Sequence, residues 1–290
     1  MKILLSLIMI FSVFNSFAQT WDQYIYRGKQ ERAKGNFEKA GFFIAKGAEL
    51  KGTNNFEHYY YAAIMYANAN NLDSSFKLLS KCIDAGMFDW ARWERNSRLK
   101  LLRDDKRWTE MHDKMVKAEQ EYSRALSKPS LREALKKMWK RDQDLVGKWD
   151  QQKVVVDQNT LRLNRIIDQY GWPTRSMVGK DGSWMAWAIA QHSQDIHFQR
   201  KCLKLLEKTL ATNEPEPVLY AELYDRICRN TNHKQKFGQA IIEKNGVKKF
   251  YPIENKPGVD ARRASIGLVP LQVYANENHV EYKSEKSSRM

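Results

Sequence analysis

The residues of this chain that could do chemistry lie in its second half, around His192. If residues 184–199 form one continuous helix, His192, Asp195 and Gln199 follow one another at separations of three and four residues and share a helix face. A carboxylate one turn away from a histidine fixes the tautomer of the imidazole and raises its basicity. This spacing predicts a general base at His192 that Asp195 orients.

Four more polar residues follow along the chain. Asp225 and Arg226 are an adjacent acid–base pair, and Gln235 and Gln239 stand near Gly238. Arginine could hold an anionic group, while the glutamines offer neutral hydrogen-bond donors and acceptors. We therefore assign as candidate catalytic residues His192, Asp195 and Asp225, and as candidate ligand-binding residues Gln199, Arg226, Gln235 and Gln239.

The same residues also have a purely structural interpretation, because a buried His–Asp or Asp–Arg pair commonly ties helices together without chemistry. No metal site is predicted, since His197 comes two residues after Asp195 and lies off the helix face of His192. No cofactor is predicted either. The sequence lacks a Gly-x-Ser-x-Gly elbow, a His-Glu-x-x-His motif, a phosphate-binding loop and a dinucleotide fingerprint. Whether the chain is an enzyme stays open.

The three cysteines are too few for a disulfide scaffold. Cys202 and Cys228 could pair if their helices lie antiparallel in an oxidising compartment, and otherwise they are buried free thiols. Both are expected at helix-core positions, which leaves cysteine-nucleophile chemistry open but unsupported.

The elements that must position these residues begin after an N-terminal secretory signal peptide over residues 1–18. Lys2 supplies the positive charge, residues 3–14 are an almost unbroken apolar run, and residues 16–18 form a small-residue exit. The run is shorter than the roughly 20 apolar residues that span a bilayer, and no second long apolar run follows. We therefore expect an exported protein, periplasmic or secreted, without a transmembrane segment. The alternative is a buried N-terminal helix of a cytosolic protein.

The formal net charge is +15 at pH 7, which favours anionic partners. An anionic envelope ligand fits this charge. The basic residues are nevertheless mixed with acids, as in residues 140–144, rather than gathered in a run. A solvated cationic surface explains such a mixture equally well, and export argues against a nucleic-acid partner.

Residues 21–120 contain an internal repeat in which small and large side chains recur. Small residues are expected where paired helices approach closely, and large ones fill the gap between the helices. A shift of 35 residues brings similar side chains into register: Tyr24 with Tyr59, Gly28 with Ala63, Ala40 with Ser75, and Ile44 with Leu79.

This pattern resembles the tetratricopeptide repeat, a helix–turn–helix unit of about 34 residues. Glu31 departs from it, because a tyrosine is usual there, and neither repeat ends in proline. The segment from Asp89 to Trp108 resembles the terminal segment that often follows such repeats. The resemblance implies a concave face for a protein or peptide partner, although a structural spacer is an equal alternative.

A domain boundary is expected at residues 128–130, where Ser130 would cap a new helix that continues through Trp149. The pattern over 183–210 is helical, either continuous or broken near Asp195, and another helix covers 216–230. Asn245-Gly246 lies between two β-forming runs and predicts a hairpin over about 240–251. The charged tail over 283–290 is expected to be disordered.

The expected fold is therefore mostly α. It consists of an N-terminal α-solenoid of two tetratricopeptide-like repeats plus a capping helix over 19–127, and a helical domain over 128–282 with a small β-hairpin.

A series of short motifs over about 130–275 resembles an uncharacterised bacterial family, a domain of unknown function. The resemblance implies a fold and candidate residues but no activity. Gln194, Phe237 and Ala240 depart from the family pattern and weaken the assignment of Gln239. The motifs that carry the resemblance are Tyr170-Gly171-Trp172-Pro173, Gln191-His192, Asp195, Phe198-Gln199, Asp225-Arg226, Gln235, Gly238-Gln239 and Arg262-Arg263.

Two functions follow from these observations. The first is an exported interaction or ligand-binding protein, whose repeats support a C-terminal domain with a binding surface around His192, Asp225 and Arg226. The alternative is an envelope hydrolase in which His192 is the general base, Asp195 or Asp225 orients it, and Arg226 holds an anionic group.

Overall fold

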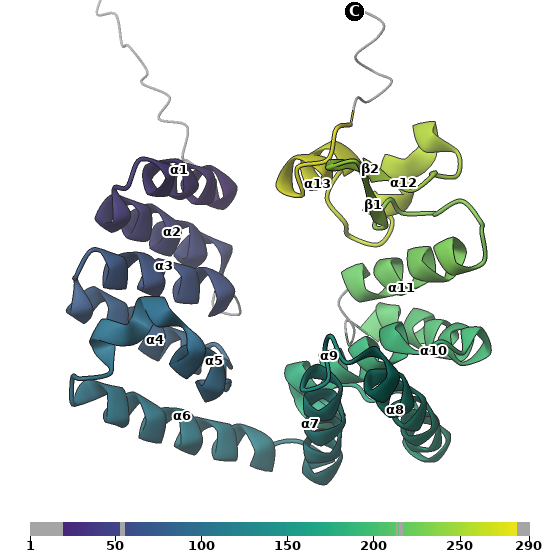
Figure 1. Ribbon diagram of the computed structural model, residues 1–290, viewed down its shortest axis with the longest axis horizontal. Coiled ribbons are helices and arrows are strands. Elements are labelled where there is room, and N and C mark those ends of the chain that lie inside the picture. The colour runs from purple at the N-terminus through teal and green to yellow at the C-terminus, as the bar shows by residue number, and fades with distance from the viewer. Residues whose placement is uncertain (1–19, 53–55, 213, 215–216, 283–290) are drawn as a thin grey trace, which may run out of the picture. The chain divides into compact units, whose positions relative to one another are not determined.

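The computed structural model describes residues 20–52, 56–212, 214 and 217–282 (Figure 1). The predicted signal peptide and the predicted disordered tail lie outside the described residues. The chain divides into two compact units, Met1–Tyr122 and Ser123–Met290. Most of the described chain is α-helix with one two-stranded antiparallel sheet, which confirms the predicted fold class. No helix in the described ranges is long and apolar enough to cross a membrane.

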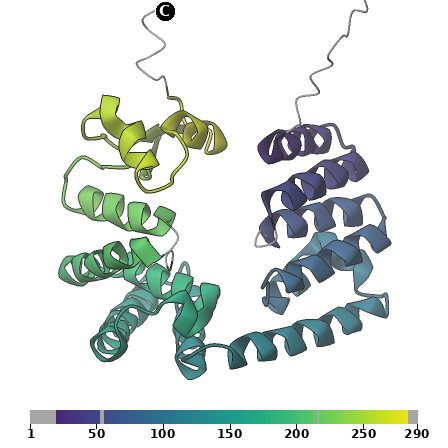
Figure 2. The same ribbon diagram turned by 180° about the vertical axis from the view of Figure 1, so that it is seen from behind.

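In the first unit α1 packs against α2, α2 against α3 and α3 against α4, and η1 packs against α3 and α5 (Figure 1 and Figure 2). Its core includes residues that are fully excluded from solvent, among them Ile44, Leu79 and Trp93. The elements are α1 Trp21–Ala33, α2 Phe37–Lys51, α3 Phe56–Asn68, α4 Leu72–Asp84, α5 Trp90–Arg95, the 3-10 helix η1 Ser97–Leu102, and α6 Arg107–Arg124.

Small residues lie where these helices approach most closely, as the repeat pattern predicts. A methyl group on Gly28 would come within 2.5 Å of Ile44 Cγ1 and 3.1 Å of the Ala40 carbonyl oxygen. In the next helix pair the Ser75 hydroxyl donates to the buried carbonyl of Ala63 at 2.9 Å. A larger side chain at either place would force the helices apart.

Several polar contacts in this unit recur at nearly the same sequence separation. Each of five hydrogen bonds joins two residues 32 to 35 positions apart. They are Glu38–Asn71, Glu49–Lys81, Glu57–Arg92, Asp73–Arg107 and Ser80–Lys114.

The second unit begins with five helices around an apolar core, in which α9 packs against α7, α8, α10 and α11, and α10 also packs against α11. Leu135, Leu163, Cys202 and Leu223 are fully buried in this core. The elements are α7 Pro129–Gln143, α8 Trp149–Tyr170, α9 Arg175–His192, α10 Ile196–Thr209, η2 Leu210–Thr212, α11 Pro217–Asn230, β1 Ile241–Lys244, β2 Val247–Phe250, η3 Lys256–Gly258, α12 Val259–Ala264 and α13 Leu271–Glu277.

Two helix limits differ from the prediction. Helix α7 begins at Pro129 with Lys128 as its N-cap, rather than being capped by Ser130. Proline suits the first helical position because its missing N–H has no intrahelical partner there. The helix ends at Gln143, since the chain turns through Gly147, whose φ of 87° favours glycine, before α8 starts.

The hairpin forms where the Asn-Gly pair predicts it. Asn245 and Gly246 have φ values of 54° and 73°, the left-handed conformation that a two-residue hairpin turn needs. The strands pair from Lys244 with Val247 at the turn to Ile241 with Phe250 at the open end.

Candidate functional site

The helical stretch over 184–199, which the sequence left either continuous or broken near Asp195, is broken there, and the break changes the roles of its polar residues. Helix α9 ends at His192, and Asp195 is the N-cap of α10, where its Oδ1 accepts the N–H groups of His197 at 2.9 Å and Phe198 at 3.1 Å. A carboxylate that caps a helix in this way is turned toward backbone donors. The prediction that Asp195 orients His192 from one helix turn away is therefore wrong.

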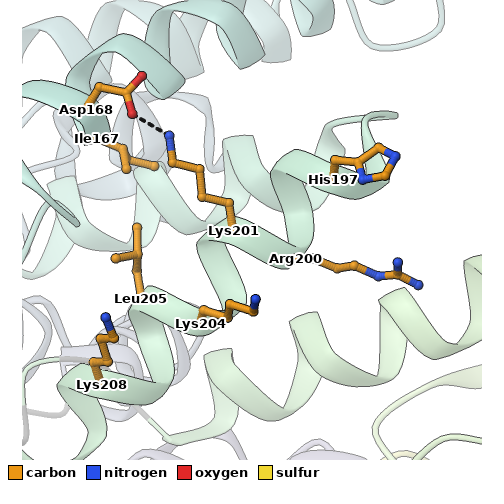
Figure 3. Close-up of a pocket in the computed structure, with 8 residues that line it drawn as sticks. All are labelled: Ile167, Asp168, His197, Arg200, Lys201, Lys204, Leu205 and Lys208. Carbon is orange, nitrogen blue, oxygen red and sulfur yellow. Dashed lines mark hydrogen bonds and ion pairs between the residues drawn. The ribbon is translucent and has the colours of Figure 1, made fainter.

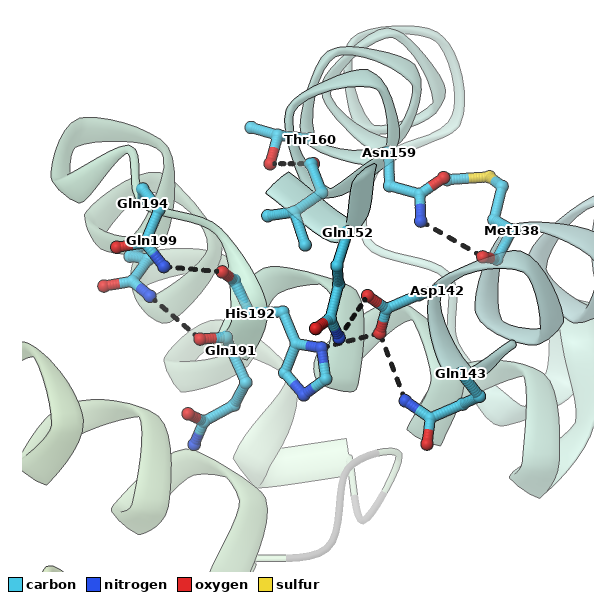
Figure 4. Close-up of polar contacts among 11 residues, drawn as sticks. Met138, Asp142, Gln143, Gln152, Asn159, Thr160, Gln191, His192, Gln194 and Gln199 are labelled. Atoms are coloured by element: carbon cyan, nitrogen blue, oxygen red, sulfur yellow. Dashed lines mark hydrogen bonds and ion pairs between the residues drawn. The ribbon is translucent and has the colours of Figure 1, made fainter. Parts of the chain in front are cut away.

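Gln199 stabilises the break rather than facing an open site. Its side chain is buried, and the two N–H groups of Nε2 are shared among the carbonyl oxygens of Ala190, Gln191 and Ser193, which lie at 3.2, 3.2 and 2.9 Å. Figure 4 shows the contact with Gln191. These carbonyls belong to the end of α9 and the residue after it, where helices leave acceptors without intrahelical partners. Gln199, in the first turns of α10, therefore provides hydrogen-bond donors for the unpaired carbonyl groups at the end of α9.

The carboxylate partner of His192 is Asp142, which the sequence analysis did not assign to the site. Nδ1 of His192 lies 2.7 Å from Asp142 Oδ2 (Figure 4). The carboxylate is almost fully buried, with 2% of its side chain exposed, whereas 35% of the imidazole is exposed. When Nδ1 donates to this carboxylate, Nε2 is the nitrogen left to meet a ligand.

Helix α7 places Asp142 on its buried face. Leu131, Leu135, Met138 and Asp142 follow one another at helical spacing, and all four are buried. An acid at the end of an apolar stripe was the sequence signal that could have identified Asp142. Its carboxylate also accepts longer hydrogen bonds from the Nε2 atoms of Gln143 and Gln152, at 3.2 and 3.4 Å.

One tryptophan adjoins the imidazole, and a second packs against the first. The Trp139 ring centroid lies 5.4 Å from that of His192, and Trp184 meets Trp139 edge-to-face at 5.1 Å. Trp184 is 40% exposed, so the aromatic surface that runs from His192 through Trp139 reaches solvent at Trp184. Such a surface suits a ligand with one apolar face and one hydrogen-bonding edge.

Asp225 is fully buried and turned toward backbone. Its carboxylate accepts the N–H groups of Lys236 at 2.7 Å, Phe237 at 3.0 Å and Gln239 at 2.8 Å. Burial raises the pKa of Asp225, and the three hydrogen bonds oppose that rise. Asp225 therefore holds the loop after α11 in place and is separate from the hydrogen bonds of His192.

Gln235 anchors the same loop to the hairpin. Its Nε2 donates to the carbonyl oxygens of Ala240 and Tyr251 at 3.0 and 2.6 Å, and its Oε1 accepts the Ala240 N–H at 2.7 Å. Each of these partners is backbone, so the side chain fixes the path of the chain at the base of the hairpin. A ligand-binding role would require breaking these bonds.

Arg226 and Gln239 keep polar atoms without hydrogen-bond partners in the described part of the chain. Arg226 Nε and Gln239 Oε1 are both buried in this state. Burial lowers the pKa of Arg226, and the nearby charge of Arg229 lowers it further. Arg226 does not pair with the adjacent Asp225, whose partners are the backbone groups of the loop.

The predicted site thus separates into two places, the His192–Asp142 contact and the loop held by Asp225 and Gln235.

Burial raises the pKa of the Cys202 thiol to about 12 and of the Cys228 thiol to about 11, so both free thiols are protonated at neutral pH. Within the residues that the structure covers, no group of three or more His, Cys, Asp or Glu side chains could hold a metal ion.

Comparison with known proteins gives one match. The model of a family described as "Family of unknown function (DUF6624)" matches residues 139–283, which is half of the chain and includes Asp142, His192 and Asp225. No curated protein and no solved structure matches the chain.

Proposed function

We propose that this chain, which belongs to the DUF6624 family of unknown function, is an exported ligand-binding protein whose helical repeats support a C-terminal binding domain. The observation that carries the proposal is the partly exposed imidazole of His192, hydrogen-bonded to the buried Asp142 at 2.7 Å. The buried carboxylate fixes the ring, and the ring keeps a second nitrogen for a ligand.

The ligand-binding surface consists of His192 together with Trp139 and Trp184. A rigid aromatic surface loses little conformational entropy on binding, and one fixed hydrogen-bonding atom adds orientation. A small polar molecule with an apolar face fits this chemistry. The binding surface leaves out three residues that the sequence also suggested, because their side-chain polar atoms already form hydrogen bonds with backbone groups. They are Asp225, Gln199 and Gln235.

The first unit is proposed to be a pair of tetratricopeptide-like repeats with a capping segment. The 35-residue period, the close approach at Gly28 and the recurring contacts between successive helix pairs support this interpretation. Such units bind peptides or proteins, so a protein partner on the repeat face is proposed as well. Export to the periplasm or beyond rests on the signal-peptide pattern of residues 1–18.

The proposal is tested by NMR titration of the chain from Gln19 with four defined probes: glucose, acetate, inorganic phosphate and the dipeptide Ala-Ala. We expect at least one probe to shift both the imidazole signals of His192 and the indole N–H signal of Trp184. The shift of the Trp184 indole N–H signal should disappear in His192→Gln, and the far-UV circular dichroism should remain unchanged. If no probe shifts both signals, the binding surface is not at His192.

A second candidate function is hydrolysis with His192 as general base, and the His192–Asp142 hydrogen bond is the observation that favours it. Nε2 would take a proton from water as the water attacks a carbonyl carbon, and Asp142 would stabilise the imidazolium. The imidazolium would then give its proton to the leaving oxygen as the bond between that oxygen and the carbonyl carbon breaks. In this candidate function Asp142 orients His192, the role that the sequence analysis gave to Asp195 or Asp225.

This candidate is tested with p-nitrophenyl acetate as an activated probe ester. We expect hydrolysis above the buffer rate and a loss of about 10²-fold or more in His192→Gln, a typical contribution of a general base. Asp142→Asn should also slow the reaction. Equal rates for the wild-type chain and His192→Gln would reject catalysis at this site and leave the binding proposal intact.

A further inference from the structure

A groove between α8 and α10 combines an apolar floor with a row of cationic side chains. It has a volume of about 590 Å³. Ile167 of α8 and Leu205 of α10 point toward one another in it (Figure 3). A smaller cavity of about 280 Å³ adjoins it, shares His197 and Lys201 with it, and adds Leu161, which is 61% exposed. The two cavities are neighbours along α8 and α10, and together they are called the α8–α10 groove.

The cations of the groove differ in whether an acid already neutralises them. Lys201 spans to α8, where its Nζ lies 2.5 Å from Asp168 and 2.7 Å from Asn164. Arg200, Lys204 and Lys208 are exposed, and in the described part of the chain no acid or hydrogen-bond partner contacts them. The groove therefore carries an excess of positive charge along α10.

The spacing of these three cations is regular. They recur every four residues on α10, which places successive side chains about 6 Å apart along the helix. In an extended peptide, side chains on one face recur every two residues, or about 6.6 Å. Acidic residues at alternate positions of an extended peptide would therefore match the cation row, while the residues between them would face the floor.

We propose that the α8–α10 groove binds an extended acidic peptide segment in which apolar residues alternate with the acids. The cation row attracts its carboxylates, and Ile167, Leu205 and Leu161 receive its apolar side chains. An inorganic polyanion would make no use of the apolar floor. The inference goes beyond the proposed function, because it concerns a surface that does not include His192.

The test measures fluorescence anisotropy of a fluorescein-labelled peptide with Glu and Leu alternating over twelve positions, added to the chain from Gln19. The paired variant Lys204→Glu/Lys208→Glu reverses two charges of the groove. The control Lys234→Glu/Lys249→Glu makes the same change in net charge at exposed lysines elsewhere in the second unit. Circular dichroism checks that all variants are folded.

We expect saturable binding that the groove variant weakens at least ten-fold, that the control weakens less than two-fold, and that His192→Gln leaves unchanged. A twin peptide with Gln in place of Glu should bind at least ten-fold more weakly, and Leu161→Ser should weaken binding of the acidic peptide. Equal losses in both charge-reversal variants, or equal binding of the twin, would overturn the proposal. So would binding of inorganic polyphosphate or phosphatidylglycerol vesicles without binding of the peptide.

Discussion

Two regions of the second unit each contain a buried aspartate, yet the two carboxylates bind different kinds of donor. Asp142, 2% exposed, accepts a hydrogen bond from the ring of His192, which itself reaches solvent. Asp225 is fully buried and accepts three backbone N–H groups from residues 236–239. The residue type and the burial are nearly the same, and only the donors differ.

The difference shows that the donors decide what a buried carboxylate can do. Backbone N–H groups in one loop are fixed, so Asp225 can only stabilise that loop. A histidine has a second ring nitrogen, so the charge of Asp142 can influence a ligand or a proton outside the core. We expect the Asp225 region to control folding stability and the Asp142 region to control the chemistry of His192.

The largest effect is expected for Asp225→Asn. The amide would turn an NH₂ group toward backbone donors and leave part of the loop unsatisfied, lowering the free energy of unfolding by about 3 kcal/mol. Urea denaturation measures this value. Asp157→Asn, at an exposed position of α8, is the control and should change stability little. A loss below about 1 kcal/mol would remove the contrast between the two aspartates.

A smaller loss is expected for Gln199→Leu, which removes the donor from three carbonyls at the α9–α10 break. The unfolding free energy should fall by about 2 kcal/mol, because buried acceptors remain without partners. Gln194→Leu is a matched control, since exposed Gln194 also donates to the His192 carbonyl and water can replace it there. Similar losses in both variants would contradict a special role for the buried amide.

Asp142→Asn should cost only about 1 kcal/mol, because the asparagine oxygen can still accept a hydrogen bond from Nδ1. Its main effect should be on the imidazole. In the wild-type chain Asp142 favours the tautomer with the proton on Nδ1, and the neutral amide should favour it less. ¹⁵N chemical shifts of His192 measure the tautomer populations. If the variant loses as much stability as Asp225→Asn, the two regions do not differ as proposed.

The smallest effect at neutral pH is expected for His58 of the first unit. Like His192, it lies against a tryptophan, Trp21, but among the residues that the structure describes no carboxylate is hydrogen-bonded to it. Burial lowers the pKa of His58 to about 4, and the charges of Lys51 and Lys29 add to the decrease. Between pH 6.5, the ordinary histidine value, and pH 4, the unfolded chain gains a proton that the folded chain does not. The free energy of unfolding should therefore decrease as the pH is lowered from 6.5 to 4, and it should stay constant below pH 4 as far as His58 is concerned.

His58→Gln should make that part of the stability profile flatter. Thermal unfolding at several pH values between 4 and 7 measures the difference from the wild-type chain. His197→Gln, at an exposed position, serves as control and should leave the slope unchanged. An unchanged slope in His58→Gln would show that a histidine without a carboxylate partner titrates as it does in the unfolded chain.

Local features of the sequence were sufficient to predict the helical class, the hairpin and the close contacts of the first unit. Asn245-Gly246 specifies a turn through its own backbone conformation, and Gly28 and Ser75 specify close approach through their size. These predictions depend on one residue or on near neighbours, which is why a pattern in the chain was enough.

The partners of the polar residues were decided only by tertiary structure. His192 and Asp142 are 50 positions apart and meet because α7 packs against α9. The break that turns Asp195 into a helix cap depends on buried contacts such as the 3.0 Å hydrogen bond from Thr160 of α8 to Ser193. Polar side chains bind whichever donor or acceptor the packed helices bring near them. A buried polar group without a hydrogen-bond partner lowers the stability of the fold. The chain therefore determined by itself which residues were available, and helix packing determined which of them form a site.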